Sequence, residues 1–216
     1  MKQKRYGVTT KTLVAMLALV LLIGCGIGGT LAYLTSKTDE VVNTFTVGNI
    51  VIDLFEHEYV DGKLTNTEVR NGGNTYKIVP GVNLDKDPTV VVKGDSEDCW
   101  LFVKVDETNW PTAALADGTK KVSYGIAEGW TQLAGVTGVY YRKVTSNTAD
   151  QSFYVLKDNE VTVSDELTTE EVNRIGTGAN APKLTFTAYA VQLEGFNDTT
   201  KTEGANAALA WDEATK

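Results

Sequence analysis

The sequence has few of the residues on which hydrolytic enzymes and metal sites rely. Its 216 residues include one histidine, His57, between two glutamates. A catalytic triad needs a histidine beside a nucleophile, and one histidine cannot supply both helical ligands of a zinc protease. His57 follows a predicted strand and lies beside a predicted turn, where we expect a solvated side chain. We therefore expect no enzyme activity, no metal ligand and no cofactor.

Cysteine is nearly as scarce as histidine. Cys25 lies inside the N-terminal apolar run, so Cys99 has no partner with which to form a disulfide in the rest of the chain. A neighbouring carboxylate, here Asp98, raises the pKa of a thiol. We therefore expect Cys99 to be a structural residue. The absence of a disulfide framework is compatible with export from a Gram-positive type of cell.

Basic residues are outnumbered, with 20 against 28 acidic residues and a net charge of −8. Such a charge repels phosphates and argues against nucleic acid as a partner. The sequence also lacks a phosphate-binding glycine motif in a strand–helix context. Three acidic clusters lack the residue order of a calcium-binding loop, and we expect them to be solvated. They are Asp85/Asp87, Asp95/Glu97/Asp98 and Asp165/Glu166 with Glu170/Glu171.

The N-terminus has the three-part layout of a secretory signal peptide. Residues 1–11 are basic, residues 13–23 are apolar, and the stretch GCGIGGT that follows is made of small residues. We predict a signal helix within residues 1–32. An uncleaved membrane anchor is the alternative, because no charge interrupts Thr12 to Ser36. The four glycines between residues 24 and 29 argue against a continuous helix there.

Two processing sites compete in this segment. Thr30 and Ala32 place small residues at the −3 and −1 positions, so that cleavage would leave Tyr33 as the first residue. Leu22-Ile23-Gly24-Cys25 also has the form of a lipobox, after which Cys25 would be lipidated. The N-terminal segment alone does not decide between them.

Beyond residue 43 the chain has the alternating, β-branched and aromatic pattern of short strands separated by turns. Asp-Gly, Asn-Gly and Pro-Gly pairs mark the turns. The predicted strands are Asn43–Leu54, Thr89–Lys93, Trp100–Asp106, 120–125, 138–144, 152–156, 160–163 and Leu184–Leu193. Three short helices are predicted, at Thr108–Leu115, Thr168–Ile175 and Gly204–Glu213.

This pattern predicts a mainly β protein: an antiparallel two-sheet sandwich of jelly-roll or immunoglobulin-like type over residues 44–216. We expect the four tryptophans to fill its core or its ends rather than to bind sugar.

Three stretches resemble the TasA/camelysin family of exported proteins, which are processed by a SipW-type signal peptidase. The first is GGTLAYLT (28–35) followed by NTFTVGNI (43–50) and IDL (52–54). The second is VPG (79–81) with KDP (86–88), before the strand that follows Cys99. The third is LTFTAYAVQ (184–192) with the tail that ends at Trp211. Residues 107–180 carry no family signature.

The resemblance implies a secreted jelly-roll subunit of extracellular or cell-surface fibres in a biofilm matrix. Cleavage after Ala32 would free residues 33–43 as a donor strand that completes the sheet of the next subunit. Tyr33, Leu34, Val41 and Val42 are its apolar residues. The implied partners are further copies of the chain, the signal peptidase and an accessory anchoring protein. The membrane would be involved only through the signal segment before cleavage.

Two other hypotheses follow from the same residues. One is a surface-anchored lipoprotein or binding module, lipidated at Cys25. The other is a metalloprotease, the activity assigned to camelysin-like members of the family. The sequence departs from every zinc-protease pattern, so we expect a structural protein.

Overall fold

The computed structural model describes residues 49–70 and 72–216, which belong to one compact unit. The predicted signal helix, both processing sites, Cys25 and the donor segment 33–43 lie outside the described residues. In the part that is described, no helix combines the length and apolar character needed to cross a membrane.

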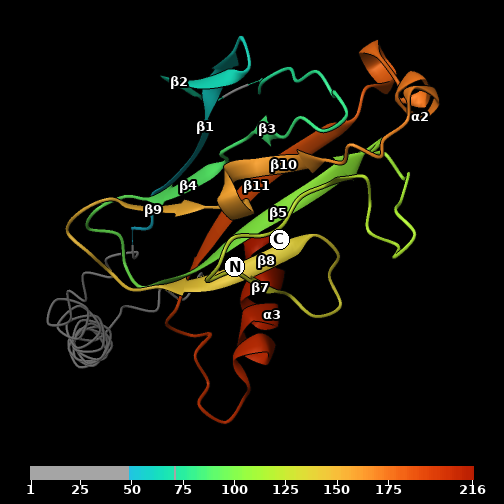
Figure 1. Cartoon of the computed structure of the whole chain (residues 1–216). Helices are drawn as coiled ribbons and strands as arrows, with labels where there is room; N and C mark the ends of the chain where they lie inside the picture. Colours follow the sequence, from blue (N-terminus) through green and yellow to red (C-terminus); the bar gives the residue numbers. More distant parts are fainter. Residues whose placement is uncertain (1–48, 71) are drawn as a thin grey trace, which may run out of the picture. The chain divides into compact units, whose positions relative to one another are not determined.

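The described residues form three antiparallel sheets with a few short helices, so the prediction of a mainly β, antiparallel protein is confirmed (Figure 1). Where we expected two sheets, short strands around β10 form a further one. The β1 sheet has the order β2 (Lys63–Val69), β1 (Ile52–Val60), β4 (Thr89–Val92) and β9 (Gln151–Tyr154). The β5 sheet has the order β11 (Lys183–Gln192), β5 (Cys99–Thr108), β8 (Val139–Val144) and β7 (Thr131–Gln132). The β10 sheet has the order β3 (Leu84–Asp85), β10 (Glu160–Val163) and β6 (Val122–Ser123).

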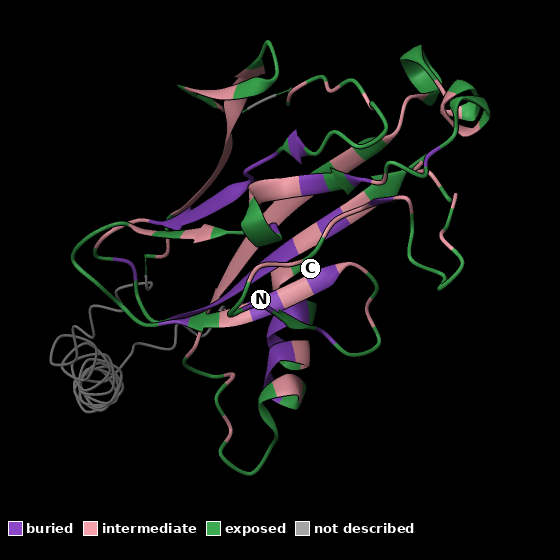
Figure 2. Cartoon of the chain, in the orientation of Figure 1, coloured by how far each residue is buried: buried purple, intermediate pink, exposed green. Residues whose placement is uncertain are grey.

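Strand β5 is buried on both faces (Figure 2). One face carries Cys99, Leu101, Val103 and Val105, which share a core with Val90 and Val92 of β4 and other residues. The other face carries Trp100 and Phe102, which α3 (Glu203–Ala214) covers with Ala207, Ala210 and Trp211. An apolar run without strict alternation is what burial on both faces requires.

A third core lies beneath the β10 sheet. Its buried residues are Leu84, Val122, Leu156, Val161, Val163 and Leu167. Leu184 and Phe186 of β11 are packed against this core and against the core on the Cys99 face of β5. The start of β11 therefore lies where two cores meet.

Two of the three predicted helices are confirmed. Helix α2 (Thr169–Arg174) begins with a capping box, in which the Thr168 hydroxyl accepts from the Glu171 N–H and the Glu171 carboxylate accepts from the Thr168 N–H. Helix α3 begins after Thr202, whose hydroxyl accepts from the Ala205 N–H. Lys157–Asn159 and Gly178–Asn180 form single 3₁₀ turns.

The predicted helix at Thr108–Leu115 is wrong. Strand β5 continues to Thr108, and Asn109 then adopts a left-handed conformation with φ 52°. Trp110 precedes Pro111, whose ring disfavours the α conformation of the residue before it. The segment instead forms a loop, in which the Leu115 N–H donates to Thr119 O at 2.8 Å.

The strand boundaries also differ from prediction at the N-terminal end. The predicted strand Asn43–Leu54 begins outside the described residues, and it does not end at Leu54, because β1 continues to Val60. The Asp61-Gly62 turn then leads into β2, which the sequence did not predict. Strand β1 changes partner along its length: Ile52–Phe55 pair with β4, and Glu56–Val60 pair with β2.

Candidate functional site

Strand β11 forms the edge of the β5 sheet. It pairs with β5 on one side, and no strand of the described residues pairs with its other side. The Leu193 N–H donates to Asp98 O at 2.8 Å just past the strand end. Because bonding directions alternate along an antiparallel pair, the N–H and C=O groups of Leu184, Phe186, Ala188 and Ala190 point away from β5. A strand edge whose backbone groups are unpaired can accept another strand.

Beside the start of this edge lies a groove of about 1000 Å³, which we call the edge groove. Its walls are β11 at Lys183–Phe186, β1 at Leu54–Glu56, the chain from Asn74 to Ile78, and the end of α2 with the chain after it. Its apolar lining includes Phe55, Ile78, Leu84, Trp110, Val172, Ile175, Leu184 and Phe186. A concave apolar surface with a few polar groups is typical of a binding site.

A nearly buried ion pair supports one wall of the edge groove. The Lys86 ammonium lies 2.6 Å from a Glu56 carboxylate oxygen, and their side chains are 9% and 13% exposed. The same ammonium lies 5.0 Å from the centre of the Tyr76 ring and 5.3 Å from that of Phe186. Burial, followed by the charge of Glu56, raises the pKa of the Tyr76 hydroxyl. The lysine thus joins β1, β11 and the Tyr76 segment at one point.

His57 is not the solvated residue that the sequence predicted. It lies within β1, where its Nδ1 is 2.6 Å from Asp87 Oδ2 and its backbone N–H donates to Asp87 Oδ1 at 3.0 Å. Asp87 is buried, which corrects the expectation of a solvated Asp85/Asp87 cluster. A buried carboxylate requires such partners, because an unpaired one would be costly. The His57–Asp87 contacts thus connect β1 to the chain that leads into β4.

The Asn74 side chain also binds the backbone of β1. Its Oδ1 accepts from the Tyr59 N–H at 2.9 Å, and its Nδ2 donates to His57 O at 2.8 Å. The side-chain amide therefore occupies the position that a neighbouring strand would fill. Arg70, which follows β2, binds the Asp53 carboxylate of β1 through Nε and Nη2. Its hydrogen bonds lower the pKa of Asp53.

A second hollow, of about 920 Å³, lies at the other end of β11 and is lined by Asp95, Glu97, Asp98, Glu194 and Asp198. Within residues 49–70 and 72–216, no three His, Cys, Asp or Glu side chains are placed to hold a metal ion. Two of the carboxylates already accept hydrogen bonds: Asp98 from the Ser146 N–H, and Asp198 from Thr200. The Asp95/Glu97/Asp98 cluster lies here.

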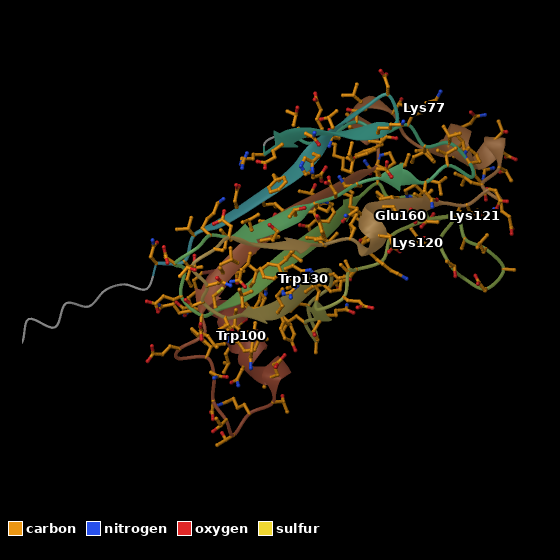
Figure 3. The ribbon with its side chains drawn as sticks, turned by 60° about the vertical axis from the view of Figure 1, so that its left-hand side comes forward. Lys77, Trp100, Lys120, Lys121, Trp130 and Glu160 are labelled. Atoms are coloured by element: carbon orange, nitrogen blue, oxygen red, sulfur yellow. The ribbon has the colours of Figure 1, made fainter. Side chains whose placement is uncertain are left out.

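The remaining candidate residues are placed as follows. Cys99 is fully buried, and burial, followed by the charge of Asp98, raises the pKa of its thiol to about 11. Trp100, Trp130 and Trp211 are buried in the cores, as expected (Figure 3 labels Trp100 and Trp130). Thr30, Ala32, Tyr33, Leu34, Val41, Val42 and Cys25 lie outside the described residues, so they stay predictions.

The edge groove itself was not predicted from the sequence. Lys86-Asp87-Pro88 was singled out for its family resemblance, Asp87 also as part of an acidic cluster, and the NGGN stretch that ends in Asn74 only as a turn. Both stretches prove to contact β1. Two charged residues before a proline and a buried strand were a usable signal, because charges there need partners from elsewhere in the chain.

No family model matches the chain, and neither the search of curated proteins nor that of solved structures finds a match.

Proposed function

We propose that this chain is a secreted structural protein that assembles by donor-strand exchange into fibres of a biofilm matrix, outside the cell or at its surface. In this proposal the signal peptide is removed after Ala32 by a SipW-type signal peptidase, and the described domain is a jelly-roll of the TasA/camelysin kind. The observation that carries the proposal is the open edge of β11 beside the edge groove.

An incoming strand would satisfy the backbone groups that this edge leaves unpaired. The outward N–H and C=O groups of Leu184, Phe186, Ala188 and Ala190 supply the hydrogen bonds of β-strand addition, and alternate side chains enter pockets. The edge groove offers such pockets at the Leu184 and Phe186 end of the strand. The apolar residues Tyr33, Leu34, Val41 and Val42 would provide the side chains.

Addition of this kind repeats without closing. Each subunit would accept a strand from one neighbour and donate its own N-terminal segment to another. Such a head-to-tail contact produces a filament unless its rotation closes a ring. A structural role of this kind needs no catalytic residue, and we propose none.

Electron microscopy of the protein expressed from its full sequence in a secreting host tests the assembly. We expect fibres from the intact protein and monomers from a variant lacking residues 33–43. A proline substitution tests the acceptor edge. Ala188→Pro removes an outward-pointing N–H and leaves the β5 pairing in place, so we expect a folded monomer. Fibres formed by Ala188→Pro, or a wild-type protein that stays monomeric at high concentration, would overturn the proposal.

The control substitution is Thr187→Pro. The Thr187 N–H points toward β5, where Thr187 is paired with Lys104, so its loss should destabilise the fold itself. Mass spectrometry of the native N-terminus separates the proposal from the lipoprotein hypothesis. A free Tyr33 supports the fibre subunit, whereas a diacylglyceryl group on Cys25 supports a lipoprotein.

A further inference from the structure

The edge groove differs in charge from the rest of the molecule. The chain as a whole carries a net charge of −8. The lining of the edge groove instead contains four basic residues, Arg70, Lys77, Lys86 and Lys183, and a single acidic one, Glu56. A concentration of one sign of charge in a concave site favours occupants of the opposite sign.

Two of the four basic residues are already paired. Arg70 binds Asp53 and Glu68, and Lys86 binds Glu56. Lys77 and Lys183 are exposed, and neither forms an ion pair with a carboxylate of the described residues. They belong to different walls of the edge groove: Lys77 follows Tyr76, and Lys183 is the first residue of β11 (Figure 3 labels Lys77).

We infer that the edge groove selects an extended segment that carries neighbouring carboxylates, and that its occupant is residues 33–43 of a second copy of this chain. Asp39 and Glu40 of that copy pair with Lys77 and Lys183. This inference rests on the proposed function and adds to it the contacts that set the register of the inserted strand.

The spacing of the acidic pair fits two cationic walls. Successive side chains of a strand point to opposite sides, so Asp39 and Glu40 face different walls of the edge groove. The apolar residues Leu34 and Val42 lie on the same side of such a strand as Glu40, and Tyr33 and Val41 lie on the side of Asp39. Lys37 shares the side of Asp39, so the ion pairing depends on Asp39 and Glu40 themselves rather than on a strongly acidic segment. A slip by one residue would exchange the two sides and leave only one carboxylate opposite a lysine, so the loss of the other ion pair opposes that slip.

Partly exposed pairs contribute modestly to affinity, up to about fivefold each, and they weaken as salt screens them. Their main effect is to select a partner and to fix its register. The inference therefore predicts a salt-dependent assembly whose specificity follows the charges of these four residues.

A charge exchange tests it. In the protein expressed from its full sequence, we expect Lys77→Glu with Lys183→Glu to raise the critical concentration for fibres about tenfold, measured by sedimentation at low salt. Asp39→Lys with Glu40→Lys should have a similar effect. All four substitutions in one chain should restore the critical concentration to within about twofold of the wild type.

The matched control is Lys63→Glu with Lys157→Glu, two exposed lysines outside the edge groove that give the same change in net charge. We expect it to leave the critical concentration within about twofold of the wild type. An effect as large as that of the groove pair, or a fourfold variant that is not rescued, would overturn the inference.

A second measurement separates this inference from the proposed function. A synthetic peptide with the sequence of residues 33–43 is titrated against the secreted protein, beside a peptide with Asp39→Asn and Glu40→Gln. About tenfold weaker binding of the neutral peptide supports the inference even where the protein forms no fibres and the proposed function fails. Equal affinities of the two peptides overturn it even where fibres form.

Discussion

The Lys86 ammonium lies between the Glu56 carboxylate of β1 and the Phe186 ring of β11, two strands of different sheets. Because it is nearly buried, its charge is balanced by Glu56 rather than by water. One side chain thus holds together the two strands that border the edge groove.

Removing this lysine should be costly. Lys86→Met leaves the Glu56 carboxylate buried without its partner, and loss of one member of a buried pair typically costs about 3–5 kcal/mol. We expect urea unfolding to show a loss of this size. Lys86→Met with Glu56→Gln should recover a large part of it, because no charge is then buried. A double variant as unstable as the single one would contradict this account.

Gly138 should not tolerate a side chain. Its φ is 72°, and an added Cβ would lie 2.4 Å from Val105 O, the carbonyl of a residue whose N–H donates to Gly138 O. Gly135 is the matched control, with φ 79° and no atom within 4 Å of an added Cβ. Gly135→Ala should cost about 1–2 kcal/mol from backbone strain alone. Gly138→Ala should cost about 1–3 kcal/mol more, measured by urea unfolding. Equal losses would show that the clash is relieved.

Helix α3 should contribute to stability chiefly through Trp211. Its ring lies 5.4 Å from that of Phe102 and 5.1 Å from that of Tyr189, measured between ring centres. Trp211→Ala should lower the free energy of unfolding by about 3–5 kcal/mol. Leu209→Ala, on the exposed side of the same helix, should change it by less than about 0.5 kcal/mol. Similar effects of the two substitutions would mean that α3 does not cover β5 through Trp211.

Cys99 should make stability depend on pH in the alkaline range. Its thiol has a pKa of about 11 in the fold, against an ordinary value of 9.0. The unfolded chain therefore loses this proton first, so the free energy of unfolding should be unaffected by the thiol below pH 9 and fall as the pH rises toward 11. Urea unfolding across this range should show a shallower fall for Cys99→Ala. An unchanged slope in that variant would assign the fall to other groups, such as Tyr76, whose pKa is also raised.

The longest apolar strands could be predicted from the sequence because local pattern determines them. Strands β5, β8 and β11 lie within two residues of their predicted ends, since each carries apolar or aromatic residues at strand spacing. The alternation within β5 separates its residues into two faces, but it does not indicate that α3 covers the second face. Trp100 and Phe102 on that face were the signal for it.

The prediction failed where distant residues decide the local structure. The local pattern places the end of a strand before Glu56-His57-Glu58. Strand β1 nevertheless continues through these residues, because Lys86, Asp87 and Asn74 supply partners for their polar groups. The edge groove could not be predicted for the same reason. It is assembled from segments around residues 55, 76, 86 and 184, and no local pattern brings these together.

The change of partner along β1 has a mechanical consequence. The N-terminal part of β1 is joined to β4 through the paired residues Ile52–Phe55, and the chain enters this strand from the N-terminal side. A pull directed along the axis of this strand acts at right angles to hydrogen bonds that run between antiparallel strands. The bonds are then loaded together in shear, instead of being opened one after another. Tension along the axis of β1 therefore acts in the direction in which the β1–β4 pairing resists separation more strongly.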